Sequence, residues 1–159
     1  MNTRYDVAII GCGEAGIFAG YELMHRNPGL KVVTLDQGAD IYTRSCPIVA
    51  GKVKECIHCK VCDTMCGFGG AGAFSDGKLT TGTHDPRIST VFRTLVEAGA
   101  PADILYQHKP HIGTDILRDV VRNVRRELLA LGCDVRFGHR LAGLDVRDGV
   151  LRAVAVDGP

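Results

Sequence analysis

The sequence lacks a long hydrophobic run and an excess of charge of either sign. The first apolar run, at residues 7–10, is too short for a membrane span or for the core of a signal peptide. The 19 Lys and Arg residues are balanced by 18 Asp and Glu residues. We therefore expect a cytoplasmic protein that binds a small molecule, with no nucleic acid or anionic membrane surface as its partner.

The overall composition, 45% hydrophobic and 23% charged over 159 residues, is typical of a soluble globular domain. Residues 5–10 and 31–35 are predicted to form two buried strands, and residues 14–26 a helix between them. Asn27, Pro28 and Gly29 end this helix because proline cannot continue it and glycine accepts the turn. The predicted fold class is α/β, beginning with a βαβ unit.

Two amphipathic helices are predicted after a loop over residues 37–83, which is rich in glycine and cysteine and long enough to be functional. The first helix begins at Asp85 and Pro86 and ends at Gly99, and the second covers residues 114–131. The second helix carries polar side chains opposite its apolar stripe, and we expect that face to lie in solvent. Its members are Arg118, Arg122, Asn123, Arg125 and Arg126.

Three further strands are predicted over residues 134–137, 141–146 and 150–156. Asp148 and Gly149 form a strong two-residue hairpin turn between the last two. We therefore expect an antiparallel meander. Its last strand has no visible partner, so we also expect the chain to be the amino-terminal part of a longer protein.

A GxGxxG motif lies between the first strand and the first helix, with glycines at Gly11, Gly13 and Gly16. In this setting the first glycine permits a tight turn, the second lets a pyrophosphate approach the backbone, and the third lets helix and strand pack closely. The free N–H groups at the start of the helix then face the phosphates. The motif predicts a dinucleotide site.

Asp36 ends the second predicted strand, twenty residues after Gly16. A carboxylate at this position can accept hydrogen bonds from the adenosine ribose, which FAD and NAD share. In an NAD-binding domain a helix and a parallel strand normally come next, whereas here the glycine-rich loop and the meander follow. We therefore predict FAD as the cofactor.

Three segments carry a resemblance to a known family: YDVAIIGCGEAG at residues 5–16, CGFGGAGAFSDGKLT at 66–80 and KPHIGTD at 109–115. They resemble NAD(P)/FAD-dependent dehydrogenases of the glutathione-reductase-like flavoprotein superfamily, over nearly all of the chain. The resemblance implies a Rossmann-like FAD/NAD(P)-binding domain over residues 1–159, incomplete at its carboxyl end, with a Cys/Gly-rich insertion at about residues 40–83. Members of the family close the FAD site with a carboxy-terminal segment, so we expect the site to be incomplete here.

The resemblance also implies which residues contact FAD. The glycine motif and Asp36 would hold the ADP half, Arg44 would follow the acid, and the backbone of Leu141 would meet adenine. The small residues of segment 67–78 would bring backbone against the flavin or its pyrophosphate, the alternative being a flexible connection. The predicted cofactor-binding residues are Gly11, Gly13, Glu14, Ala15, Gly16, Asp36, Gln37, Arg44, Gly69, Gly70, Ala71 and Leu141.

Five of the seven cysteines lie between positions 46 and 66. In a reducing cytoplasm, closely spaced thiols are more often metal ligands or redox groups than disulfides. The last four have the spacing CxxCxxCxxxC, which matches the bacterial ferredoxin run. Cys46 is followed by Pro47, as the remote ligand of such clusters often is. A [4Fe–4S] cluster would take Cys46, Cys56, Cys59 and Cys62, with Cys66 as an alternate ligand.

Three alternatives to the iron–sulfur cluster stay open at this stage. Four thiolates also suit a structural zinc ion, and His58 could replace one of them. The CxxC pairs could instead form a redox-active dithiol, or the thiols could have no ligand.

The predicted function follows from the cofactor. We expect an FAD-dependent oxidoreductase that relays electrons between a nicotinamide nucleotide, such as NAD(P)H, or a similar donor and an acceptor that the sequence does not identify. No side chain is singled out as catalytic. The alternative is a non-catalytic carrier in which flavin and cluster pass electrons to a partner protein.

Overall fold

Three parallel strands form the central sheet in the computed structural model, which describes residues 3–158. They are β1 (Val7–Ile10), β2 (Val32–Asp36) and β3 (Asp134–Phe137), and β2 lies between the other two. All five residues of β2 are buried, as predicted. The prediction of a buried β1 is wrong, since this strand is only partly buried and has one neighbour within the described residues.

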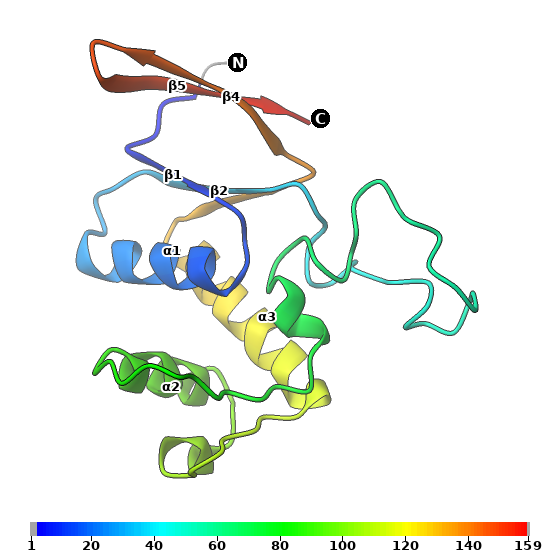
Figure 1. Ribbon diagram of the computed structural model, residues 1–159. Helices are drawn as coiled ribbons and strands as arrows, with labels where there is room; N and C mark the ends of the chain where they lie inside the picture. Colours follow the sequence, from blue (N-terminus) through cyan, green and yellow to red (C-terminus); the bar gives the residue numbers. More distant parts are fainter. Residues whose placement is uncertain (1–2, 159) are drawn as a thin grey trace.

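The helices α1 (Glu14–Arg26) and α3 (Thr114–Ala130) lie together on one side of this sheet, as Figure 1 shows. They approach closely where Gly20 of α1 faces Leu128 of α3, because a Cβ at Gly20 would lie 3.4 Å from the Leu128 side chain. The predicted βαβ unit and the long second helix are both confirmed.

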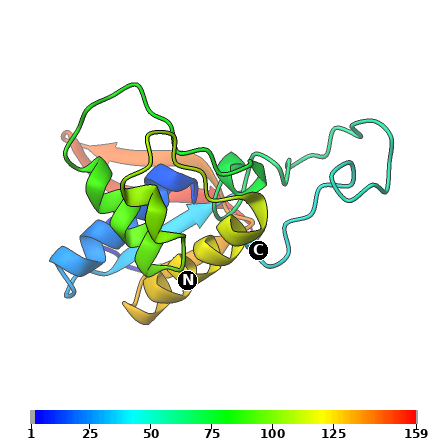
Figure 2. The same cartoon turned by 90° about the horizontal axis from the view of Figure 1, so that it is seen from below.

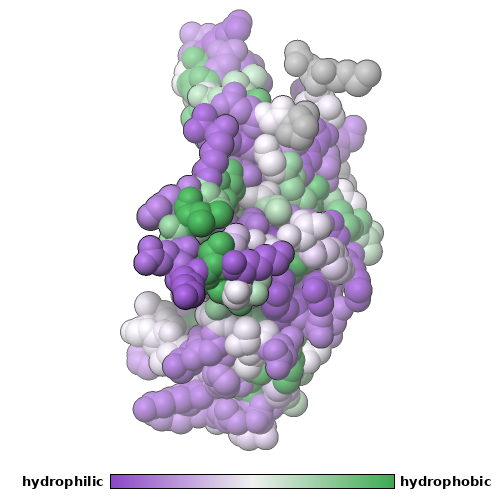
Figure 3. Space-filling view, turned by 90° about the vertical axis from the view of Figure 1, so that its right-hand side faces the viewer, coloured by the Kyte–Doolittle hydropathy of each residue, from purple (hydrophilic) through white to green (hydrophobic). Residues whose placement is uncertain are grey.

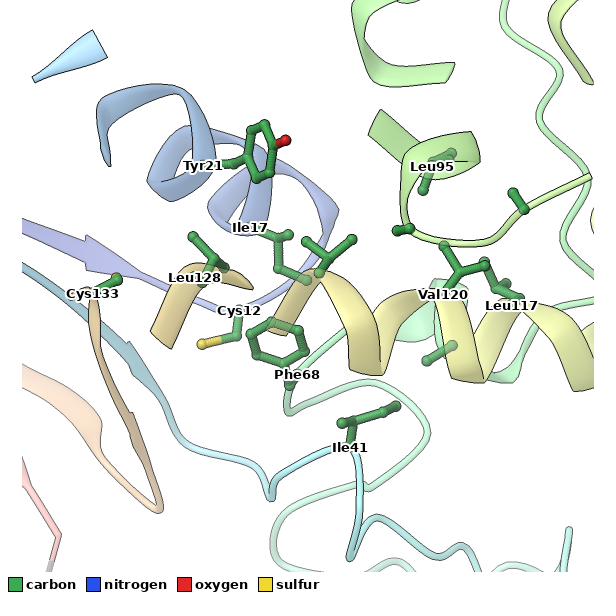
Figure 4. Packing of buried hydrophobic residues seen from close by; sticks show 14 of the residues in the cluster. Cys12, Ile17, Tyr21, Ile41, Phe68, Leu95, Leu117, Val120, Leu128 and Cys133 are labelled. Atoms are coloured by element: carbon green, nitrogen blue, oxygen red, sulfur yellow. The ribbon is translucent and has the colours of Figure 1, made fainter. Parts of the chain in front are cut away.

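The hydrophobic core lies where α1, α3 and the loop after β2 meet, and Figure 4 shows this packing. α1 contributes Ile17 and α3 contributes Val120. Ile41 and Phe68 enter from the loop and are fully buried. The loop is therefore part of the core at both of its ends, which fixes its position over the carboxyl end of β2.

The strands β4 (Arg140–Arg147) and β5 (Val150–Asp157) form a separate antiparallel hairpin. Its turn residues Asp148 and Gly149 have φ of 53° and 73°, the left-handed conformation that the sequence predicts. The predicted three-stranded meander is wrong, because β3 pairs in parallel with β2 and not with β4. Gly138, with φ 71°, turns the chain out of the parallel sheet between β3 and β4.

The helix α2 (Ile88–Glu97) begins two residues after the predicted proline start. Asp85 caps it from outside, since its carboxylate accepts the Arg87 N–H at 2.8 Å and its carbonyl accepts the Ile88 N–H at 3.0 Å. Gly99 follows the helix with φ 105°, as predicted for its end. A short 3-10 helix, η2 (Ala102–Leu105), packs beside α2.

The segment from residue 45 to residue 66 projects from the body of the molecule, and Figure 2 shows it extending away from the helices. It contains neither helix nor strand, and none of its residues is buried. The chain returns to the body at a 3-10 helix, η1 (Ala71–Phe74). No helix among residues 3–158 is long and apolar enough to cross a membrane.

Candidate dinucleotide site and cysteine-lined cavity

The GxGxxG turn joins β1 to α1 and has the backbone geometry that the motif requires. Gly11 has φ 99°, a left-handed value that favours glycine, and its N–H donates to the Leu35 carbonyl at 2.7 Å. A Cβ at Gly16 would lie 1.9 Å from the carbonyl oxygen of Gly11, so any side chain would force α1 away from the turn. The tight turn and the close helix packing are therefore both present.

A second glycine-rich loop, residues 67–70, lies directly against this turn. The Gly69 N–H donates to the Cys12 carbonyl at 2.8 Å. Gly70 has φ 53° and ψ −153°, and a Cβ there would lie 3.0 Å from the Gly13 Cα. The two loops meet backbone to backbone, and Ala71 then opens η1 beside them. The structure thus brings Gly69, Gly70 and Ala71 next to the glycine motif.

The start of α1 is an uncapped helix end. Its N-cap residue Gly13 makes no side-chain capping bond, and the first N–H groups of a helix have no acceptor within it. Such an end carries partial positive charge and suits a phosphate. Glu14 and Ala15 begin the helix there, and the Glu14 carboxylate packs against Gly72, where a Cβ would lie 2.1 Å from Oε1. This bare main chain fits the pyrophosphate of a dinucleotide.

Asp36 connects three loops through its carboxylate. The oxygens accept the main-chain N–H groups of Cys12 at 2.7 Å, Gly38 at 2.7 Å and Gly67 at 2.8 Å. The residue is 7% exposed. The predicted ribose acceptor therefore also positions the glycine turn and the second loop. A carboxylate offers about four lone-pair sites, so about one remains for a further donor.

Arg44 lies beneath the second loop and is 2% exposed. Its guanidinium donates to the Asp63 carbonyl at 2.9 Å and to the Phe68 carbonyl at 2.7 Å, and it stacks 4.9 Å from the centroid of the Phe74 ring. Burial lowers its pKa from the ordinary arginine value. The structure therefore directs these donors to one main-chain carbonyl in the second loop and one just before it, in the projecting segment.

Two more predicted residues lie at the carboxyl end of β2. Gln37 donates from Nε2 to the Cys66 sulfur at 3.2 Å. Leu141 lies in β4, just beyond a link in which the His139 N–H donates to the Asp36 carbonyl at 2.9 Å. That bond holds the beginning of β4 beside the acidic residue.

The polar face of α3 lies in solvent only in part, since Asn123 and Arg126 are exposed as predicted whereas the three other arginines are partly covered. Arg125 pairs with Asp40 at 2.5 Å, and both side chains are largely buried. Arg122 stacks 5.4 Å from the Tyr42 ring centroid, and Arg118 likewise stacks on Phe74, at 5.5 Å. The prediction is wrong for these three arginines because residues 40–44 and η1 cover them. The acidic and aromatic residues in the loop are the signal that sequence reasoning missed.

The cysteines fall into two groups. Four of them border one cavity of about 220 Å³ in the projecting segment, namely Cys46, Cys56, Cys59 and Cys62. Cys66 is not among the lining residues and lies instead against Gln37. All seven cysteines of the chain are free. Within residues 3–158 no three Cys, His, Asp or Glu side chains are arranged to hold a single metal ion.

No protein-family model matches the chain. An uncharacterized protein of Clostridium beijerinckii is 41% identical over 150 residues, which are 94% of this chain and 28% of that protein. The mitochondrial L-2-hydroxyglutarate dehydrogenase of Dictyostelium discoideum is 40% identical over 57 residues, which are 36% of this chain and 12% of that enzyme. The chain thus spans less than a third of either relative.

Among solved structures, the 3-ketosteroid-Δ4-(5α)-dehydrogenase of Rhodococcus jostii shares the fold with a TM-score of 0.60 and 14% identity. The match covers 98% of this chain and 43% of that enzyme. Together with the glycine site, such similarities define the class: the chain has the FAD-binding α/β fold of FAD-dependent oxidoreductases.

The order of the strands does not distinguish FAD from NAD in this structure. The sequence argument required that no parallel strand follow β2, and β3 is such a strand. That argument is therefore wrong. The similarity of fold to FAD-dependent enzymes supports FAD instead.

Proposed function

We propose that the complete protein binds FAD at the junction of the two glycine loops and uses it as an oxidoreductase. The junction carries the proposal, because the start of α1 and the backbone around Gly70 form a side-chain-free surface at the carboxyl end of a parallel sheet. Ligands of open α/β sheets bind at that end of the strands. The dehydrogenase names of the Dictyostelium relative and of the Rhodococcus structure favour redox chemistry.

When bound, FAD supplies the electron transfer itself, and the residues of this chain hold and orient it. The N–H groups of Glu14 and Ala15 bind the pyrophosphate, and Ala71 brings main chain close to the same place. Asp36 accepts one ribose hydroxyl through its remaining lone pair and keeps the two glycine loops together. Gln37 and the backbone of Leu141 border the adenosine end.

The donor is proposed to be a nicotinamide nucleotide or a similar two-electron reductant, in a cytoplasmic protein of the glutathione-reductase-like superfamily. The experiment is an absorption spectrum of the purified full-length protein, followed by anaerobic titration with NADH and NADPH. We expect a flavin spectrum, release of FAD on denaturation and bleaching by one of the two nucleotides. A folded protein that neither contains nor takes up FAD contradicts the proposal.

The cysteine-lined cavity favours a second candidate, a carrier that passes electrons from flavin to a partner protein. Reoxidation of the reduced flavin separates the two functions. An enzyme is reoxidised at a substrate-dependent rate by a small molecule, such as a 2-oxo acid or an enone from a panel of acceptors. A carrier is reoxidised only when a protein acceptor is added.

A further inference from the structure

The projecting segment, residues 45–66, has no core of its own. None of its residues is buried, and Val49, Ile57 and Met65 are more than half exposed. Fixing the backbone costs conformational entropy, which a segment without buried apolar side chains does not recover by hydrophobic burial. Small elements that lack a core are commonly held together by disulfides or by metal. All the cysteines are free, so no disulfide holds the segment, and a bound inorganic group would supply that stabilisation.

The segment is closed at its base, so its two ends are fixed close together. The Asp63 carboxylate accepts the Ser45 N–H at 3.1 Å. The Asp63 carbonyl accepts a hydrogen bond from Arg44 Nε at 2.9 Å. These bonds bring Cys46, at the beginning of the segment, close in space to the cysteine run at its end.

The cavity inside this loop is lined by thiols and by an apolar shell. Besides the four cysteines, it is bordered by Pro47, Ile48, Val53 and Ile57. His58, between Cys56 and Cys59, has φ 49°, which is uncommon for a residue with a side chain. Strained backbone of this kind is found preferentially at ligand sites.

We propose that Cys46, Cys56, Cys59 and Cys62 hold an iron–sulfur cluster of the four-iron type in this cavity. The spacing of the three consecutive cysteines is that of the bacterial cluster motif, and Cys46 with its following proline supplies the remote ligand. This site is separate from the flavin site, and the proposal does not depend on the proposed function.

The dimensions favour a cluster over a zinc ion. Tetrahedral zinc with Zn–S bonds of about 2.3 Å brings its sulfurs within about 3.8 Å of one another. A cube of iron and sulfide keeps its cysteine sulfurs further apart and fills a larger volume. A water molecule accounts for about 30 Å³ of the liquid. The cavity of about 220 Å³ therefore has room for a group of several atoms.

The segment carries one more basic than acidic side chain, which suits an anionic cluster. Lys52, Lys54 and Lys60 lie in the segment, against the acidic Glu55 and Asp63.

The test is metal and sulfide analysis of the full-length protein purified without oxygen, combined with electron paramagnetic resonance after reduction by dithionite. We expect iron and acid-labile sulfide in equal amounts, about four of each per chain. Flavin is quantified in the same samples, so a failure of this proposal is distinguishable from a failure of the proposed function. Zinc in place of iron overturns the proposal. Folded protein that takes up neither iron nor sulfide when incubated with both also overturns it.

The variants assign the ligands. Cys56→Ser, Cys59→Ser, Cys62→Ser and Cys46→Ser should each lose nearly all of the iron and sulfide, while their circular dichroism and FAD content show that the body remains folded. Cys66→Ser and Cys133→Ser are matched controls that should keep the cluster. His58→Gly should also keep it, because glycine accepts the positive φ and the imidazole is not a ligand. Loss of the cluster in Cys66→Ser but not in Cys46→Ser overturns this ligand set.

Discussion

The carboxylate of Asp36 accepts the main-chain N–H of Gly67 at 2.8 Å across 31 residues of sequence. The same carboxylate accepts the N–H of Cys12, so one side chain joins the turn after β1 to the loop that returns from the cysteine segment. A residue at the end of β2 therefore determines how the two glycine loops meet.

Replacing Asp36 by Asn should loosen both loops, because an amide accepts through only one of its two end atoms. Hydrogen bonds to a charged acceptor contribute about 1.5–3 kcal/mol each, so we expect the free energy of unfolding to fall by about 2 kcal/mol or more. Urea denaturation of the full-length apoprotein measures this. Asp157→Asn, which removes the acceptor of an exposed pair with Arg140, is the control and should change stability by less than about 0.5 kcal/mol. Equal effects of the two substitutions on stability would contradict the conclusion that Asp36 holds the two glycine loops together.

Replacing Gly70 by Ala should weaken FAD binding. The backbone at φ 53° and ψ −153° lies close to a region that is essentially restricted to glycine, and the new Cβ would lie 3.0 Å from the Gly13 Cα. Holding alanine in this conformation costs about 1–3 kcal/mol, so the dissociation constant for FAD should rise about fivefold or more. Fluorescence titration of apoprotein with FAD gives the constant. Gly82→Ala, where a Cβ meets nothing within 4 Å, should bind FAD like the wild type.

Sequence reasoning reached those parts of the site that local backbone determines. Gly11 and Gly16 could be assigned because a strand–turn–helix needs a left-handed turn and a close contact at those positions. The strand that pairs with β3 could not be assigned from the sequence, because the hairpin signal at Asp148 and Gly149 determines only the pairing of β4 with β5. Pairing of β3 with β2 joins segments about a hundred residues apart, and no local signal encodes it.

The same limit applies to side chains that meet across the fold. The helix pattern of α3 shows which side is apolar but not what covers the other side. The contact of Arg125 with Asp40 could therefore not be predicted from the sequence. The spacing of the cysteines left Cys46 and Cys66 as alternative ligands. In the structure Cys46 lines the cavity, whereas Cys66 lies against Gln37. This arrangement depends on the bonds that Asp63 makes at the base of the segment.

Arg125→Ala should destabilise the fold, because it leaves Asp40 partly buried without its partner. The two side chains are 16% and 21% exposed, so the loss should lie between that of a surface pair and that of a fully buried one, at about 1–3 kcal/mol. Arg126→Ala, on the exposed side of the same helix, is the matched control and should change stability by less than about 0.5 kcal/mol. A double-mutant cycle with Asp40→Ala should show a favourable coupling energy between the two residues. Additive effects would show that the pair contributes nothing beyond its separate contacts.

Cys46 should react with alkylating reagents at lower pH than an ordinary thiol. Hydrogen bonds from the Val49 N–H and the Thr64 side chain stabilise its thiolate and lower its pKa, whereas burial raises the pKa of Cys133. Since the thiolate is the reactive form, the alkylation rate of Cys46 should reach half of its plateau below the pH found for a free cysteine peptide. Cys133 should stay unmodified over the same range.

The measurement is iodoacetamide labelling of metal-free protein at a series of pH values, read residue by residue by mass spectrometry. Thr64→Val removes the one side-chain donor and should move the Cys46 midpoint upward, toward the peptide value. If the pH midpoint for Cys46 labelling in the wild type equals that of the peptide, these bonds do not stabilise the thiolate. Protein loaded with iron and sulfide should be protected at Cys46 but not at Cys66, because only the first lines the cavity.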